Sequence, residues 1–246
     1  MAKEKSLGQS IIIPVHNGAR HLARSVGQIT GHLRKNGLPP YQIVIAEDGS
    51  SDGSGAIAMR LAAKSKNILA ISRKGRLGKG RAITNALAHC KYEKVIFTDV
   101  DLSAGIEGMG EISKRLDSAD LVIGSRYLKG STCARSFSRT LLSMGYKFCV
   151  ALLFLKSHSD YQCGFKGFRK SSMYGIIRSI QADSWFWDTE IILEADALGK
   201  RIEEMPVRWH EEKITSLKVG STTLDLMLSL LRYRFFGTSC RTGGRA

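Results

Sequence analysis

The sequence predicts an α/β fold with a mostly parallel central sheet, flanking helices and a short mixed C-terminal part. Three observations support this prediction. Over the first 125 residues, β-prone apolar runs alternate with helical spacings. The polar, glycine-containing loops follow predicted strands, which is where open parallel sheets bind ligands. After Gly124 the alternation stops, and basic, glycine-rich and aromatic segments replace it.

The predicted elements follow in chain order. The first strand, 10–15, is a β-prone run that ends in a His-Asn-Gly turn. A helix follows because apolar residues from Leu22 to Leu33 recur every three or four positions, and Pro39 and Pro40 break it. Apolar runs bounded by turn residues predict further strands at 42–46, 68–72, 95–98 and 121–124. Helical spacing predicts helices after 54, at 80–89, at 140–155, from 191 and at 224–236. Because single helices separate the first strands, they should be parallel.

The chain is expected to hold one catalytic domain over residues 1–220, because 246 residues can bury a sizeable core and no linker or repeat is visible. An amphipathic helix over 221–237 and a disordered tail over 238–246 should follow. The sequence shows neither a signal peptide nor an apolar run long enough to span a membrane.

The charge balance favours partners that carry phosphate. Lys and Arg number 37 against 22 acids, which gives a net charge of +15. Between Leu121 and Arg178 there are ten basic residues and one acid, so we expect an anion-facing surface there, with a solvated basic face as the alternative. Binding to nucleic acid is disfavoured because no base-reading motif is present. Five cysteines without a CxxC pair argue against a disulfide framework and a zinc site.

An acidic triplet, Asp99-Val100-Asp101, ends the predicted strand 95–98. Two carboxylates one residue apart repel each other unless a cation or a donor-rich ligand lies between them. A divalent cation that grips a nucleotide diphosphate is one arrangement that would satisfy the pair, although an acidic triplet alone is a weak signal.

Four other loops carry chemistry-bearing residues. In the loop 47–54, Asp48 is expected to contact a ligand, whereas Asp52 and Ser54 are expected to cap a helix. Glycines and cations at 76–81 indicate either an anion site at a helix start or a solvated basic turn. In the segment 160–166 Cys163 is expected to be buried rather than nucleophilic. In 185–190 Asp188 is expected to cap a helix or, with Glu190, to face a pocket.

The motifs that identify the chain occur in order along residues 10 to 220. They are IIIPVHN at 11–17, EDGSSDGS at 47–54, LGKGRA at 77–82, DVD at 99–101, GSRY at 124–127, DYQCGFK at 160–166, WDTE at 187–190 and PVRW at 206–209, followed by Ser216 and Lys218. With them the chain resembles the inverting family 2 glycosyltransferases of the GT-A, Rossmann-like fold, and within these the dolichyl-phosphate mannose and glucose synthases. The DYQCGFK-type loop points to this polyprenyl-phosphate branch.

The resemblance implies roles for particular residues. Pro14, His16 and Asp48 would line the nucleoside pocket, with Lys79 nearby. Asp99 would contact the nucleotide and Asp101 would bind Mg²⁺ or Mn²⁺, so that both are candidate metal ligands. The remaining candidates are Arg126 and Arg139 for the phosphates, above all that of the lipid, and Gln162, Asp188 and Glu190 for the sugar.

Two departures from the family pattern leave the base of the nucleotide open. His16-Asn17-Gly18 stands where the family has Tyr-Asn-Glu, and Glu47-Asp48 replaces a pair of aspartates. The implied donor is therefore GDP-mannose or UDP-glucose, and the implied acceptor is dolichyl or another polyprenyl phosphate. A soluble or polysaccharide acceptor is the alternative.

The lipid-phosphate acceptor that the resemblance implies also implies peripheral attachment to the cytoplasmic side of a membrane, which would give the basic and apolar middle of the chain a purpose. Helices at 140–155 and 224–236 would lie in the interface. Arg135, Arg139, Lys147 and Lys156 would then lie near anionic headgroups. The alternative is that both helices pack on the core or on a second subunit of a homo-oligomer.

Overall fold

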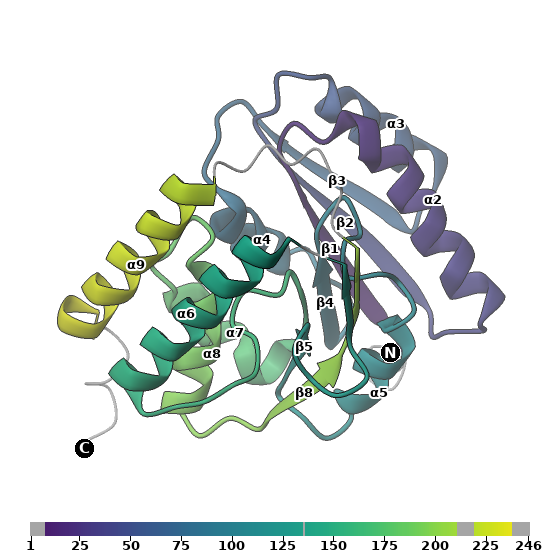
Figure 1. Cartoon of the computed structure of the whole chain (residues 1–246). Helices are drawn as coiled ribbons and strands as arrows, with labels where there is room; N and C mark the ends of the chain where they lie inside the picture. Colours follow the sequence, from purple (N-terminus) through teal and green to yellow (C-terminus); the bar gives the residue numbers. More distant parts are fainter. Residues whose placement is uncertain (1–7, 135, 211–218, 238–246) are drawn as a thin grey trace, which may run out of the picture.

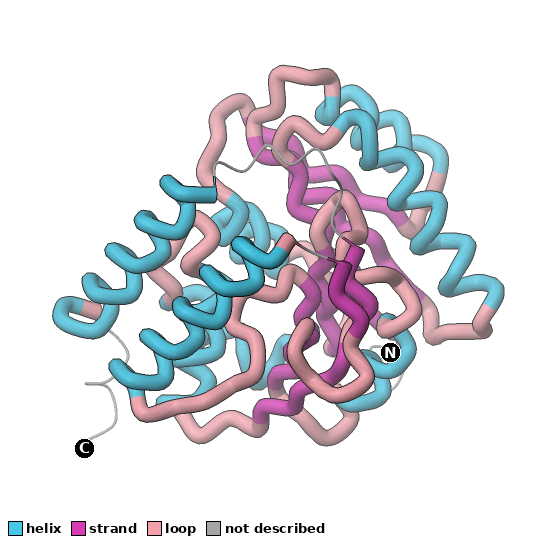
Figure 2. The backbone as a smooth tube through the Cα atoms, in the orientation of Figure 1, coloured by secondary structure: helices cyan, strands magenta, loops and turns pink. Residues whose placement is uncertain are grey.

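A seven-stranded sheet lies between two layers of helices (Figure 1). The computed structural model describes residues 8–134, 136–210 and 219–237. The strands run through the middle of the molecule, with helices on either side of them (Figure 2). Arg135, Ser216, Lys218 and the predicted tail 238–246 lie outside the described residues.

The large sheet has the strand order β3-β2-β1-β4-β7-β5-β8. Its strands are β1 (Gln9–Val15), β2 (Tyr41–Asp48), β3 (Ile68–Arg73), β4 (Lys94–Thr98), β5 (Leu121–Ser125), β7 (Phe165–Arg169) and β8 (Ile202–Pro206). Neighbouring strands are parallel except where β7 pairs antiparallel with β4 and β5. A small parallel sheet joins β6 (Thr132–Ala134) to β9 (Arg208–His210).

The two faces of the sheet bury separate apolar clusters because side chains alternate along each strand. Ile11 and Ile13 of β1 belong to one cluster and Ile12 to the other. The first cluster is covered by α2 (Ala19–Lys35), α3 (Ser54–Lys64) and α5 (Met109–Arg115). The second is covered by α4 (Lys79–Leu87), α6 (Phe137–Phe154), α7 (Lys170–Ser179), α8 (Trp187–Ala197) and α9 (Val219–Phe236).

The predicted α/β class is confirmed, as are the five predicted strands and the helices predicted between the first four of them, whereas α5 between β4 and β5 was not predicted. Strands β7 and β8 were not predicted. In β7, Lys166 and Gly167 interrupt the apolar pattern, although both are buried. Across the described residues, no helix is long and apolar enough to cross a bilayer.

Candidate active site

The predicted site loops meet at one edge of the sheet. Strands β1, β2, β4 and β5 are aligned by the sheet, so the loops that follow them emerge on the same side. Because β7 runs the other way, the segment that precedes it, 160–164, reaches the same edge. The reversed strand therefore brings the DYQCGFK motif to the acidic triplet.

Four alternating charges form the centre of the site. The Lys79 ammonium lies 2.9 Å from an Asp99 carboxylate oxygen and 3.0 Å from one of Asp188. The Lys166 ammonium lies 2.7 Å from the other oxygen of Asp188 and donates to the carbonyl of Cys163 at 2.6 Å. Lys166 and Asp188 are almost completely buried. Each buried charge is thus paired, which is what makes its burial tolerable.

The pairing sets the protonation of these groups. Burial by itself would raise the pKa of Asp188, but the ammonium groups of Lys166 and Lys79 lower it below its ordinary value. Burial opposes the charge of Lys79 as well, and Asp188 and Asp99 nevertheless raise its pKa. Asp188 and Lys79 are therefore both ionised at neutral pH, and Asp188 is a poor proton acceptor.

The acidic triplet lies where the sequence predicts it, directly after β4. A Cβ atom on Gly164 would overlap the Asp99 carboxylate, so glycine is required there for close approach. One Asp101 oxygen accepts a hydrogen bond from the amide of Ser103 at 3.0 Å. Carboxylate oxygens are hard ligands that suit Mg²⁺ or Mn²⁺. The described residues contain no cluster of three or more metal-ligating side chains, so a cation here would need oxygens from a bound diphosphate.

At the end of β2, Asp48 organises the main chain. Its two carboxylate oxygens accept from the amides of Leu77 and Gly78, each at 2.8 Å. This contact fixes the turn from which α4 and Lys79 begin. His16 Nδ1 lies 2.8 Å from the Asp48 carbonyl, while Pro14 is buried within β1. The structure thus brings His16 and Asp48 together, and whether they contact a nucleoside stays a prediction.

Asp52 and Ser54 are not the N-cap residues that the sequence predicts, because Gly53 is the N-cap of α3 and Ser54 is its first residue. The Asp52 carboxylate instead accepts from the amide and hydroxyl of Ser54 at the start of α3, and from the amide of Ala19 at the start of α2. The Ser54 hydroxyl accepts from the amide of Gly18 at 3.0 Å. One carboxylate therefore serves two helix starts and ties the first loop to the second.

After the end of β5, the Arg126 guanidinium is buried and paired with a carboxylate. It donates to both oxygens of Asp160, at 2.7 and 2.8 Å, and stacks 4.9 Å from the ring of Trp209. The predicted phosphate ligand is therefore already paired with a carboxylate in the described chain. It lines a narrow crevice together with Ser143, Tyr146 and Lys147 of α6.

Gln162 lies in the same crevice and donates to the Thr189 hydroxyl at 2.6 Å. Arg139 is half-buried on α6, one helical turn before Ser143 and two before Lys147. Residues four apart share a helix face, so the three lie on one stripe of α6. Lys147, predicted only as a headgroup contact, was thus missed as a crevice residue. Its spacing from Arg139 within the predicted helix was the signal that could have found it.

One expectation for the segment 185–190 is wrong. Asp188 caps no helix, because α8 begins at Trp187 after Phe186 and the carboxylate is bonded to the two lysines. Glu190 is buried, and its oxygens accept from the amides of Gln181 and Ala182 at 2.9 Å. Burial raises its pKa despite those hydrogen bonds. Glu190 therefore shapes the loop before α8, and its contact with a sugar stays a prediction.

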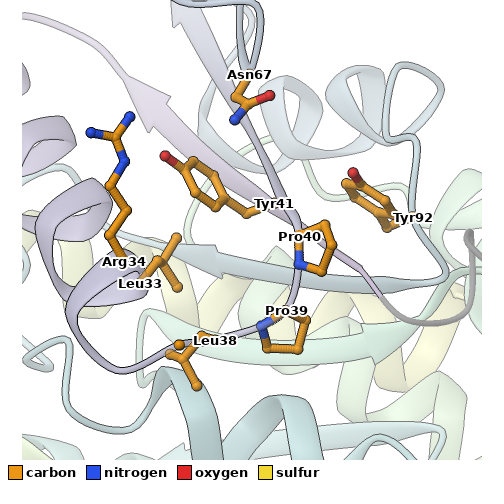
Figure 3. Close-up of a pocket in the computed structure, with 9 residues that line it drawn as sticks. Leu33, Arg34, Leu38, Pro39, Pro40, Tyr41, Asn67 and Tyr92 are labelled. Carbon is orange, nitrogen blue, oxygen red and sulfur yellow. The ribbon is translucent and has the colours of Figure 1, made fainter.

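A hollow of about 320 Å³ lies elsewhere (Figure 3). Its walls come from the end of α2 with Arg34, from the loop before β2 and its first residue Tyr41, and from Asn67 and Tyr92, which precede β3 and β4. This is the amino edge of the sheet, opposite the loops described above. None of the predicted site residues lines it.

Known proteins are similar to this chain along most of its length. The model of the family described as "Glycosyl transferase family 2" matches residues 10–176. Glycosyltransferase AglD of Haloferax volcanii is 30% identical over 226 residues, which are 90% of this chain and 35% of AglD. The chain therefore spans about a third of that relative. The human dolichyl-phosphate beta-glucosyltransferase is 27% identical over 91% of this chain and 75% of its own length.

Solved structures share the fold. Glucosyl-3-phosphoglycerate synthase from Mycobacterium tuberculosis, solved in complex with Mn²⁺ and UDP-glucose, superposes with a TM-score of 0.68 at 18% identity. The match covers 95% of this chain and 80% of that one. At this identity the likeness concerns the fold alone. The family match, however, extends over more than half of the chain, so this protein is a glycosyltransferase and belongs to glycosyl transferase family 2.

Proposed function

We propose that this chain transfers a hexose, with glucose ahead of mannose, from a nucleotide sugar to the phosphate of a dolichyl or other polyprenyl lipid. The state of Asp188 carries the proposal. A hydroxyl acceptor needs a base to remove its proton, whereas this carboxylate is buried between two ammonium groups and has a lowered pKa. A phosphate monoester is already anionic at neutral pH and needs no such base.

The relatives support the same acceptor. Several carry the name dolichyl-phosphate beta-glucosyltransferase, among them the human protein and one from Trichomonas vaginalis that is 28% identical over 92% of this chain. Their names favour glucose over mannose. They do not identify the base of the nucleotide, which stays a prediction here.

The reaction is a single displacement at the anomeric carbon. An oxygen of the lipid phosphate forms the new bond, the bond from the anomeric carbon to the nucleotide diphosphate breaks, and its electron pair leaves with the diphosphate. The configuration is inverted, and no proton needs to move at neutral pH. Catalysis then rests on positioning and on charge stabilisation.

Residues at the sheet edge divide these tasks. Lys79, which the Asp48 turn and Asp188 hold in place, lies where it can stabilise the leaving diphosphate. Mg²⁺ or Mn²⁺ on Asp99 and Asp101 would add Lewis-acid stabilisation of that group. Arg126 and Lys147 in the crevice, with Arg139 on the same helix stripe, would hold the acceptor phosphate.

The decisive test offers the protein two donors separately, UDP-glucose and GDP-mannose, with Mn²⁺ and a short polyprenyl phosphate. Labelled sugar should enter the lipid product from UDP-glucose. Asp101→Ala should abolish turnover, while Asp117→Ala, at an exposed acid, should not change it. Label that enters only a free sugar or a polysaccharide would overturn the proposed acceptor.

The acceptor residues make a second prediction for the same assay. Arg139→Ala should raise the KM for the lipid phosphate about tenfold, because a charged contact to phosphate is lost, and should change the donor KM little. Arg178→Ala, on the outer side of α7, is the matched control and should leave both constants unchanged. Equal increases in the two KM values would assign Arg139 a role outside acceptor binding.

A further inference from the structure

Exposed apolar side chains are concentrated on two helices. Among the described residues, every exposed large apolar side chain except Met59, Leu77 and Leu198 lies on α6, on its C-cap residue or on α9. Phe148, Leu152, Leu155, Phe235 and Phe236 are the most prominent, with exposures of 66% to 88%. A monomeric soluble protein rarely leaves such a patch uncovered, so the patch indicates an interaction surface.

The two helices form one continuous face. Figure 1 shows α6 and α9 side by side, on the side of the sheet away from α2 and α3. They run in the same direction, because the Phe154 and Tyr233 rings lie 5.7 Å apart and Arg234 Nε donates to the Leu153 carbonyl at 3.1 Å. Their C-terminal ends therefore bring Leu152, Leu155, Phe235 and Phe236 to the same corner.

The charges on this face identify its partner as an anionic surface. Residues 137–154 contain no acid, and α9 contains a single one, Asp225. Lys156, Arg232 and Arg234 are exposed around the apolar corner. A second copy of the chain would bring the same positive charge to the contact and be repelled. Apolar side chains ringed by cations instead match anionic lipid headgroups.

We propose that the face formed by α6 and α9, here called the α6–α9 face, docks on an anionic phospholipid bilayer. The opposite side of α6 lines the crevice, where Ser143, Tyr146 and Lys147 accompany Arg126. Docking therefore places the crevice at the depth of the headgroups, where the phosphate of a polyprenyl lipid lies. The choice of a membrane as partner rests on the proposed function, whereas the α6–α9 face itself does not.

The test is flotation of the full chain with vesicles of phosphatidylcholine alone or mixed with phosphatidylglycerol. The protein should float with the mixed vesicles, and about tenfold less with the neutral ones or in high salt. Phe148→Ser combined with Phe235→Ser should weaken binding to the mixed vesicles about tenfold or more. Met59→Ser combined with Leu198→Ser removes two apolar side chains that are exposed elsewhere on the protein, at 56% and 47%, and should leave binding unchanged.

Two outcomes would overturn the docking proposal. The first is that the full chain does not float with the mixed vesicles, or that both double variants lose binding to the same extent. The other is a dimer, seen by sedimentation without lipid, that the Phe148→Ser and Phe235→Ser pair dissociates. Transfer to a water-soluble short-chain acceptor phosphate separates the two proposals. The variant with Phe148→Ser and Phe235→Ser should retain this transfer. A protein that binds vesicles but makes no such transfer would overturn the proposed function and leave the docking proposal standing.

Discussion

At the residue scale, Lys166 is the charge on which the site depends. It is completely buried, and its ammonium bonds Asp188 and the carbonyls of Tyr161 and Cys163. Lys166→Met should lower the free energy of unfolding by about 3 to 5 kcal/mol, since it leaves a buried carboxylate with one partner. Urea denaturation measures this loss.

Lys166→Met should also change the pH at which the protein begins to unfold on acidification. The lowered pKa of Asp188 means that its stabilisation is present above its unfolded pKa and is lost as pH falls through the folded value. Without Lys166 the folded pKa rises, so acid unfolding should begin at higher pH. Lys94→Met, which breaks a pair with the exposed Asp117, should lower the unfolding free energy by less than about 1 kcal/mol. Equal losses in the two variants would show that the pairing of Lys166 is not special.

Residue roles were predictable where the residue type already limits the chemistry. Asp52 lies at a loop-to-helix junction, where an aspartate commonly bonds main-chain amides, and its carboxylate accepts from the first amides of two helices. The Asp188 carboxylate instead meets Lys79 and Lys166, which lie 109 and 22 positions away in the sequence. No local pattern contains that information, so the expected capping by Asp188 failed.

At the element scale, α9 belongs to the main core. Leu230 is completely buried in the same cluster as β4 and α8, and the Tyr233 hydroxyl donates to Glu194 of α8 at 2.6 Å. Leu230→Ala should lower the free energy of unfolding by about 2 to 4 kcal/mol while unfolding stays a single transition. Leu228→Ala, on the exposed side of the same helix, should change it by less than about 0.5 kcal/mol. A separate early transition in Leu230→Ala would instead make α9 an independent segment.

The strands that could be predicted are those whose buried residues form a continuous apolar run in the sequence, such as Val95-Ile96-Phe97 of β4. Strand β7 is equally buried but holds a lysine and a glycine. The lysine is there for Asp188, and a Cβ on Gly167 would press on Ile112 and Leu116 of the α5 region. Strand β8 carries Glu203 and Glu204, because it lies at the edge of the sheet. The pairing of Lys166 with Asp188 interrupts the apolar pattern of β7, and the edge position interrupts that of β8. Neither cause is visible in the local sequence.

At the scale of the whole molecule, the site joins loops from both halves of the chain. Asp48, Lys79 and Asp99 come from the first half, and Lys166 and Asp188 come from the second. A donor bound there should therefore stabilise the entire fold by binding only the native state. At about one hundred times its dissociation constant, UDP-glucose with Mn²⁺ should add about 2.7 kcal/mol. For a chain of this size that corresponds to a rise in Tm of about 5 to 10 °C.

Thermal melts can separate the contributions of the donor and the cation to this stabilisation. UDP-glucose with EDTA should raise Tm by less than half as much, because the charge of the diphosphate would then meet Asp99 and Asp101 without a cation between them. Asp101→Ala should remove the increment due to Mn²⁺, and Asp117→Ala should keep it. An identical rise in Tm with Mn²⁺ and with EDTA would mean that Lys79 alone neutralises the diphosphate, and Asp101 would then have no part in donor binding.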